Sequence, residues 1–452
     1  MMRKQSLWLI GTCAMLYMAL TACATAQSQN NAASKDNKPI EYDIRPNKKD
    51  GIFRNNDRIG YDVRVINKSF NKQRGTLYVE VFDYKGNSLY NQTIGLSIET
   101  RRIFATDLKL DYGKLEPGFY TVKFIVNTNS ARDTLIHVFG LDPEKIYTNV
   151  SKPEDFDQFW NEARKDLYKI EPKFRAINRG DLSTVFANVY AVEMQSMGNQ
   201  TIRGWLSVPK GKGKYPVIYE LPDYFSSFRP DSLRSDIAVF RLDVRGHGSS
   251  RDKIYDDYGT LNTLNLNDKS QYIYRDIYMD ALRGLDFIYK YSPNLGFDPT
   301  KVVIAGKGQG AAIAAAVASM DNYRLKGCII EGPSYTDMRG LFETNENKAD
   351  KKWPVDVFSN YINTSGISKE DFFYMWQYFD PAVFAPNIKC RVLYATGLRN
   401  DVSPPQQAFA VYNQLTNTIK DIYIDPLAAR ELGYVYYAYQ SLWLKRALNL
   451  AR

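Results

Sequence analysis

The chain has 452 residues, which is too long for one ordinary domain and predicts two or more. Its hydrophobic share of 44% and its charged share of 24% are those of a soluble globular protein. The formal net charge is +9, but no basic run or stripe stands out, so the composition argues against a nucleic-acid partner.

The first residues have the pattern of an export signal. Two basic residues precede an apolar run from Leu7 to Leu20, which is too short to cross a membrane as a helix. The run ends in Leu20-Thr21-Ala22-Cys23, which is similar to the lipobox of bacterial lipoproteins, where the cysteine carries lipid. We therefore expect a signal peptide over residues 1–22. A lipid on Cys23 would hold the protein against a membrane of the bacterial cell envelope, periplasmic or surface-exposed. The alternative is a plain secretory signal that is cleaved nearby.

A polar tether and an all-β domain are expected next. Residues 23–39 are polar and show no periodicity, as in a flexible linker. From residue 40 to 140, short runs alternate apolar and polar positions with a period of two, and turn residues such as Lys85-Gly86-Asn87 separate them. About seven such strands predict a β-sandwich of the immunoglobulin type.

The pattern changes in the remaining chain, residues 150–452. Residues 153–167 repeat apolar positions at helical spacing, with Asp155 as the expected cap. Uninterrupted apolar runs then alternate with helical segments, which is typical of a parallel sheet covered on both faces. We expect a doubly wound α/β domain with strands over residues 215–221, 238–246, 301–306, 327–332, 391–397 and 421–426.

A glycine turn at the centre of this domain raises the question of its chemistry. Between a buried strand and an alanine-rich helix, Gly306-x-Gly308-x-x-Ala311 fits the fingerprint of a dinucleotide-binding loop. The next strand ends in Glu331, about where an acid that binds a ribose would lie. However, such a unit normally opens its sheet, and here three or more strands precede it. Nucleotide binding is therefore the weaker hypothesis for this turn.

Several longer segments between about Ser151 and Gly433 occur in a recognisable order. They are KPEDFDQFWNEARKDL, LDVRGHGSS, YIYRDIYMDALRGLDFI, FDPTKVVIAGKGQGAA, YFDPAVFAPNIKCRVLYATGLRNDVSPPQQAFAVYNQL and IYIDPLAARELG. Together they resemble the acetyl xylan esterase and cephalosporin C deacetylase family of α/β-hydrolases. The resemblance implies an α/β-hydrolase fold with a mostly parallel sheet for residues 150–452. It also implies deacetylation as the family activity and a homo-oligomer, because relatives often form rings of subunits.

The same resemblance places the family's catalytic residues on this sequence. The nucleophile of the Gly-x-Ser-x-Gly motif falls on Gly308, the triad histidine falls on Arg430, and the triad acid falls on Asp401, where it is retained. The resemblance also implies that the backbone amides of Tyr224 and Gln309 are the donors of an oxyanion hole.

These replacements remove two of the three parts that acyl transfer by a triad requires. Gly308 has no attacking atom, and the guanidinium of Arg430 cannot accept a proton. Loss of a triad in a comparable serine protease costs about 10⁶-fold in kcat, so conventional ester hydrolysis should be absent. We further hypothesise an ion pair between Arg430 and Asp401, and a positively charged pocket to which Lys307 contributes. The chain is then a glycan-binding or scaffold pseudoenzyme whose partner is an acetylated or acidic oligosaccharide.

The alternative is an active carbohydrate acetyl esterase that uses other residues. His247 is the one candidate for a replacement base, since the other histidine, His137, lies in the expected sandwich. Replacement nucleophiles would have to come from loop serines at the carboxyl ends of strands, which are Ser226, Ser227, Ser249 and Ser403. No group of His, Cys, Asp and Glu has ligand spacing, so neither a metal nor a cofactor is expected.

Overall fold

The computed structural model describes residues 38–110, 115–251, 260–345 and 351–450. The expected signal peptide, the lipidation site Cys23 and nearly all of the expected tether lie outside these ranges. Within them, no helix is both long enough and apolar enough to span a membrane.

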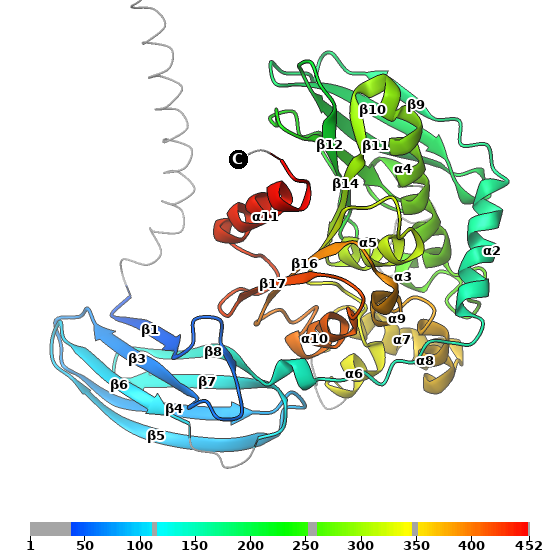
Figure 1. The fold of residues 1–452 in the computed structure, drawn as a ribbon. Coiled ribbons are helices and arrows are strands. Elements are labelled where there is room, and N and C mark those ends of the chain that lie inside the picture. The colour runs from blue at the N-terminus through cyan, green and yellow to red at the C-terminus, as the bar shows by residue number, and fades with distance from the viewer. Residues whose placement is uncertain (1–37, 111–114, 252–259, 346–350, 451–452) are drawn as a thin grey trace, which may run out of the picture.

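Two small sheets form the N-terminal part of the molecule (Figure 1). One has the strand order β1-β3-β6, and the other has the order β2-β8-β7-β4-β5. The strands are β1 (Ile40–Pro46), β2 (Ile52–Phe53), β3 (Gly60–Asn67), β4 (Gln73–Phe82), β5 (Ser88–Ile98), β6 (Ile103–Lys109), β7 (Gly118–Thr128) and β8 (Arg132–Leu141). All pairs are antiparallel except β2 with β8.

The period of two in the sequence explains how the small sheets share a core. In β4 the side chains of Leu77, Val79 and Val81 are buried, while the residues between them are partly exposed. They pack in one apolar cluster with buried residues of β3 and β7. An all-β N-terminal unit is thus present, and its assignment to the immunoglobulin type stays a prediction.

A nine-stranded mixed sheet forms the second unit, with the order β17-β16-β15-β14-β12-β13-β11-β10-β9. Pairs from β17 to β13 are parallel, and β11, β10 and β9 continue the sheet in antiparallel fashion. The strands are β9 (Arg175–Asn178), β10 (Ala187–Gln195), β11 (Thr201–Pro209), β12 (Tyr215–Leu221), β13 (Ala238–Asp243), β14 (Phe297–Lys307), β15 (Gly327–Glu331), β16 (Arg391–Gly397) and β17 (Lys420–Asp425).

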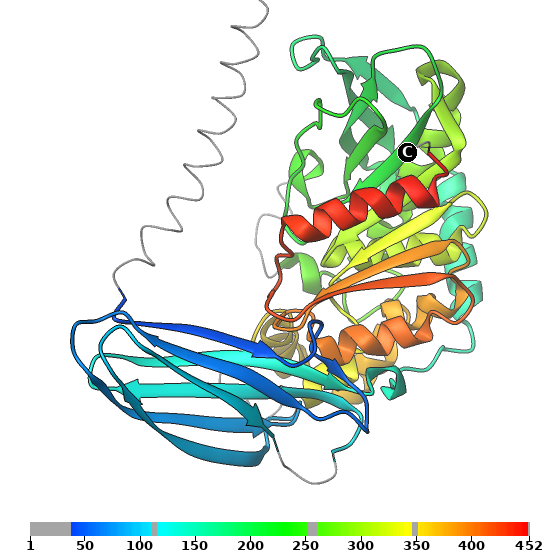
Figure 2. The ribbon, with the colours of Figure 1, turned by 60° about the vertical axis from the view of Figure 1, so that its left-hand side comes forward.

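Helices cover both faces of this sheet, as Figures 1 and 2 show. On one face, α2 (Phe156–Tyr168), α4 (Ile273–Leu295), α5 (Gln309–Met320) and α10 (Pro405–Gln414) share an apolar core with the strands. On the other face, α11 (Tyr434–Ala447) covers a separate cluster. The expected doubly wound α/β domain is confirmed, since apolar strands of this kind need cover on both sides.

Shorter helices complete the second unit. They are α3 (Thr260–Thr263), α6 (Met338–Glu343), α7 (Val355–Ser365), α8 (Lys369–Trp376) and α9 (Pro381–Phe384), with single turns η1 (Pro143–Lys145), η2 (Met197–Asn199), η3 (Gly248–Ser250) and η5 (Ala385–Asn387). Helices α6, α7 and α8 lie between β15 and β16 in the chain and pack through aromatic side chains.

The two units meet where the chain leaves β16. The ring of Phe119 on β7 packs against Phe409 of α10 at 5.1 Å between centroids, and its amide donates to Oε1 of Gln406 at 3.1 Å. Leu398 and Ile52 join the same buried cluster. We call this contact the domain interface. It places the all-β unit beside the loops that follow the parallel strands.

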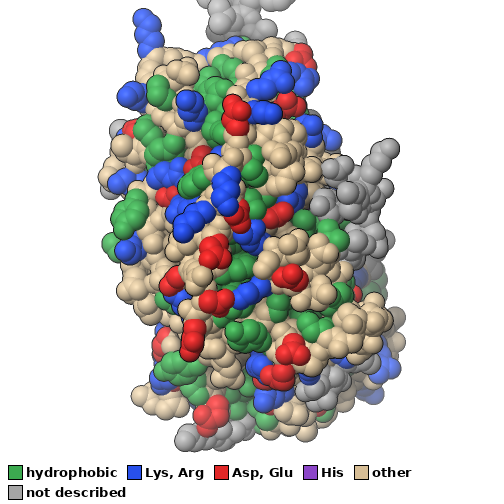
Figure 3. Space-filling model, turned by 90° about the vertical axis from the view of Figure 1, so that its right-hand side faces the viewer, with side chains coloured by type: hydrophobic (Ala, Val, Ile, Leu, Met, Phe, Trp, Pro, Cys, Tyr) green, Lys and Arg blue, Asp and Glu red, His purple; other side chains and the backbone are tan. Residues whose placement is uncertain are grey.

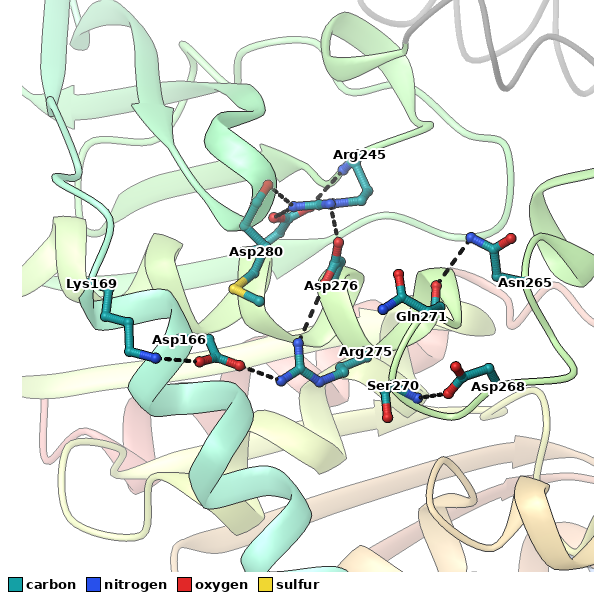
Figure 4. Close-up of polar contacts among 11 residues, drawn as sticks. Asp166, Lys169, Arg245, Asn265, Asp268, Ser270, Gln271, Arg275, Asp276 and Asp280 are labelled. Carbon is teal, nitrogen blue, oxygen red and sulfur yellow. Dashed lines mark hydrogen bonds and ion pairs between the residues drawn. The ribbon is translucent and has the colours of Figure 1, made fainter.

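Buried charges also position loops of the second unit. Arg245, just after β13, pairs with Asp280 at 2.7 Å and with Asp276 at 2.5 Å, and both acids come from α4 (Figure 4). Because a buried guanidinium is costly without partners, this network fixes the loop that carries His247.

On the face in Figure 3, basic and acidic side chains are interspersed.

Candidate active site

The glycine turn forms the junction of β14 and α5, as its sequence predicts. Gly308 has φ 55° and ψ −119°, a left-handed conformation that glycine adopts without strain. Its amide donates to the carbonyl of Glu331 at 3.0 Å, and its carbonyl accepts the amide of Ser334 at 3.0 Å. The turn therefore has the sharp strand-to-helix geometry that presents a nucleophile in hydrolases.

The space in front of Gly308 is filled by the carboxylate of Asp223, from the loop that follows β12. A Cβ atom at position 308 would lie 2.8 Å from Cγ of Asp223 and still closer to its Oδ1. Any side chain at 308 would overlap this carboxylate. Asp223 was not among the site residues expected from the sequence.

Both expected oxyanion-hole donors bind this same carboxylate. The amide of Tyr224 donates to Oδ1 of Asp223 at 2.7 Å, and the amide of Gln309 donates to the same oxygen at 3.2 Å. The amide of Gln309 also opens helix α5, whose dipole favours a negative charge at that end. The two amides thus converge as an oxyanion hole requires, but the anion that they hold belongs to the protein itself.

Arg430 completes this arrangement from the loop after β17. Its Nη2 lies 2.5 Å from Oδ2 of Asp223, and both side chains are only partly exposed, at 36% and 20%. The hypothesis of an Arg430–Asp401 pair is therefore wrong. Asp401 is exposed and lines a cavity at the domain interface, whereas Asp223 lies within reach of the guanidinium.

The expected positive pocket is also corrected by this geometry. Lys307 forms an ion pair with Glu431, so each cation beside the turn has its own carboxylate. The charges at the turn are balanced within the protein. A negatively charged ligand gains no net attraction from these two pairs.

Asn400, the neighbour of Asp401, points inward instead. Its side chain is 5% exposed, and its Oδ1 accepts the amides of Val402 at 3.1 Å and Ser403 at 3.0 Å. Its Nδ2 lies where a Cβ on Gly332 would approach within 3.0 Å. The loop after β16 therefore brings the amide of Asn400 toward the loop after β15, and it directs Asp401 toward the all-β unit.

His247 lies beside the turn but is fully buried. Its Nδ1 is 3.0 Å from the carbonyl oxygen of Arg245, and its Nε2 is 2.8 Å from Nε2 of Gln309. The first contact makes Nδ1 a donor and leaves Nε2 to accept from the Gln309 amide. Burial lowers the pKa of His247 to about 4. With both nitrogens engaged inside the protein, the imidazole holds the side chain of Gln309 in place.

Three of the four loop serines, all but Ser227, have hydrogen-bond partners within the protein. The hydroxyl of Ser226 donates to the carbonyl of Asp223, that of Ser249 donates to Asp243, and that of Ser403 donates to the carbonyl of Pro333. None of these three contacts is with a histidine. They do not form a nucleophile–base pair.

Glu331, the acid of the dinucleotide hypothesis, is buried at the end of β15. Its carboxyl hydrogen-bonds to the hydroxyl of Tyr436 on α11, and burial raises its pKa to about 7. It is only 6% exposed, so it does not offer a carboxylate to a ribose. Among the described residues, no group of three or more His, Cys, Asp and Glu is arranged to hold a metal.

The second unit is similar in sequence to known acetyl esterases. A family model described as acetyl xylan esterase (AXE1) matches residues 137–447. The acetyl esterase Axe7A of Xylanibacter ruminicola is 24% identical over 360 residues, which are 75% of this chain and 77% of the relative.

Two solved structures share the fold of the second unit. Acetyl xylan esterase 1 from a Thermoanaerobacterium species is 22% identical with a TM-score of 0.61, over 68% of this chain and 97% of its own. The acetyl xylan esterase of Paenibacillus sp. R4 is 24% identical with a TM-score of 0.60, over 67% and 98%.

Proposed function

This chain belongs to the acetyl xylan esterase family, and we propose that it is a member that has lost ester hydrolysis and binds a glycan instead. The observation that carries the proposal is the position of the Asp223 carboxylate. It accepts the amides of Tyr224 and Gln309 and pairs with Arg430, in the space where a side chain at Gly308 would stand.

Each requirement of acyl transfer is unmet at this turn. There is no hydroxyl to attack, and a guanidinium cannot act as the base. The two amides that would stabilise a tetrahedral oxyanion already hold a carboxylate, which carries a full negative charge. Loss of the triad alone would lower kcat by about 10⁶-fold, and loss of the oxyanion donors would lower it further.

The ligand class follows from the relatives. Their names assign them acetyl xylan esterase and acetyl esterase activity, so an acetylated oligosaccharide of the xylan type is the proposed ligand. A lipid on Cys23 would tether this binding function to a membrane of the cell envelope, on the periplasmic side or at the surface.

Acetate release tests the loss of hydrolysis. The purified protein and the Paenibacillus sp. R4 enzyme would be incubated in parallel with acetylated xylo-oligosaccharides, and free acetate would be measured. We expect release by the relative and none above the blank by this chain. Turnover by this chain would overturn the proposal and would direct mutagenesis to His247 and the loop serines.

Glycan binding is measured separately by calorimetric titration with the same oligosaccharides and with their deacetylated and glucuronic-acid-substituted forms. Saturable heat is the expected result for at least one of these ligands. If none of these three kinds of oligosaccharide binds, the proposal of glycan binding is wrong, even if the protein releases no acetate. The remaining hypothesis is then a scaffold role.

A further inference from the structure

A cavity of about 430 Å³ lies at the domain interface, apart from the glycine turn. This volume is within the range of about 300–1,000 Å³ that is typical of small-molecule sites. Both units contribute to its wall. Tyr84 and Ile136 come from the all-β unit, and Arg399, Asp401 and Gln406 come from the loop after β16 and the start of α10.

The all-β wall is built from the outward residues of its strands. Along β7 and β8, alternate side chains point into the sandwich core, and those between them point away from it. Ile136 is one of the outward residues and keeps 40% of its surface exposed. Tyr84, in the turn after β4, keeps 38% exposed. Two large side chains with apolar surface therefore remain open to a ligand in this wall.

The opposite wall carries polar groups that the protein does not fully use. Among the described residues, Asp401 has neither a hydrogen bond nor an ion pair. The guanidinium of Arg399 reaches one carbonyl, that of Leu427, at 3.4 Å. This is the reverse of the glycine turn, where every cation has its own carboxylate. Polar groups left open in a cavity are suited to bind the hydroxyls of a ligand.

The place in the fold also favours a binding site. The loop after β16 follows the carboxyl end of a parallel strand, where open α/β sheets bind their ligands. Gln406 on the cavity wall ties the two units together through the amide of Phe119. The wall is thereby held in one shape before a ligand arrives, which lowers the cost of binding.

We propose that this cavity, and not the glycine turn, binds a short xylo-oligosaccharide. One apolar face of a sugar ring would stack on Tyr84 and contact Ile136. Asp401 and Arg399 would form hydrogen bonds with the hydroxyl groups of the sugar. This inference rests on the proposed function for its ligand class, and it locates the site from the exposed side chains of the two walls. Arg399 and Asp401 carry opposite charges, and Lys352 adds a further cation to the wall.

Titration calorimetry with xylotetraose tests the location. We expect the parent to bind, Tyr84→Ala to weaken the affinity about tenfold through loss of ring contact, and Asp401→Asn to weaken it several-fold. Tyr323→Ala is the matched control, because Tyr323 is 90% exposed and lies outside the cavity wall. It should bind like the parent. Thermal unfolding of each variant checks that the fold is intact.

Three outcomes separate this inference from the proposed function. Binding that survives Tyr84→Ala and Asp401→Asn but is lost in Arg430→Ala would overturn the cavity and keep glycan binding, at the turn. Acetate release by a protein whose xylotetraose binding needs Tyr84 would overturn the loss of hydrolysis and keep the cavity. No binding of xylotetraose by the parent would overturn the cavity inference itself.

Discussion

The glycine turn lies at the junction of β14 and α5, and the interface cavity is lined by the loop after β16; the two regions use their charged groups in opposite ways. At the turn, Asp223 pairs with Arg430 and Lys307 pairs with Glu431. At the cavity, Asp401 has no partner among the described residues. At the glycine turn, the carboxylates and cations of these two pairs therefore satisfy one another within the protein. The ligand site that we propose lies instead where the all-β unit meets the α/β unit.

The prediction with the largest expected effect concerns variants designed to introduce ester hydrolysis at the glycine turn. We expect Gly308→Ser/Arg430→His to remain inactive in acetate release, because Asp223 still holds both oxyanion donors. Adding Asp223→Ala should raise the rate of the double variant by about 10²- to 10³-fold, the effect of an oxyanion hole. Asp223→Ala alone is the control and should release no acetate above the blank. Activity in the double variant would mean that the carboxylate does not block the hole.

The stability cost of a side chain at position 308 is the next largest effect. Gly308→Ser should lower the free energy of unfolding by about 3 kcal/mol, since it combines a left-handed φ with overlap on Asp223. In the Asp223→Ala background, about 1–2 kcal/mol of that cost should disappear. Urea unfolding measures the free energy of unfolding of Gly308→Ser in both backgrounds.

Gly366→Ser provides the comparison, because Gly366 has φ +78° and a Cβ added there would meet nothing within 4 Å. It should cost only the backbone strain, about 1 kcal/mol. Equal costs at 308 and 366 would show that Asp223 leaves room for a side chain.

Glu331, close behind the turn, predicts a pH dependence. Its pKa is raised from 4.5 to about 7 in the folded protein, chiefly by burial. The stability from this raised pKa is fully present below pH 4.5 and is lost as the pH rises through 7. The free energy of unfolding of Glu331→Gln should therefore exceed that of the parent by about 3 kcal/mol at about pH 8.5, and the difference should shrink toward about pH 5.

Urea unfolding across this pH range checks the prediction, with the exposed Glu154→Gln as a control that should follow the parent. A constant gap between Glu331→Gln and the parent would mean that Glu331 does not titrate as its burial implies.

The smallest effect concerns the Arg430–Asp223 pair. Both partners are partly exposed, so Arg430→Ala should lower the free energy of unfolding by about 1 kcal/mol. The difference should shrink at about 1 M salt, which screens such pairs. Arg45→Ala, which removes a pair whose arginine is 72% exposed, should have less effect. An unchanged unfolding midpoint for Arg430→Ala would leave Asp223 held by the amides alone.

Local patterns were enough to predict the elements around the site. The turn at Gly308 follows from the run of a buried strand into glycine and alanine, and the alternation in β4 follows from Leu77, Val79 and Val81. The partner of Arg430 could not be predicted this way. Asp223 and Asp401 both follow parallel strands, and only the folded sheet places one of them within reach of the guanidinium.

The loop after β16 shows a second limit of sequence reasoning. Asn400 and Asp401 are neighbours in the turn that follows β16, but one is buried and the other is exposed. The side chain of Asn400 is held inward because it accepts the amides of Val402 and Ser403. The cavity could not be predicted from the sequence either. Ile136 stands in a regular alternating strand, and nothing local distinguishes a face that meets solvent from one that meets another unit.

The shared space of Gly308 and Asp223 has an evolutionary consequence. A serine introduced at 308 would collide with the carboxylate of Asp223, and loss of Asp223 alone would leave Arg430 without this partner and the turn without a nucleophile. Neither single change supplies both a nucleophile and free oxyanion donors at the turn. Under the proposed loss of hydrolysis, the two positions work as a ratchet, because a change at either one alone meets an obstacle set by the other.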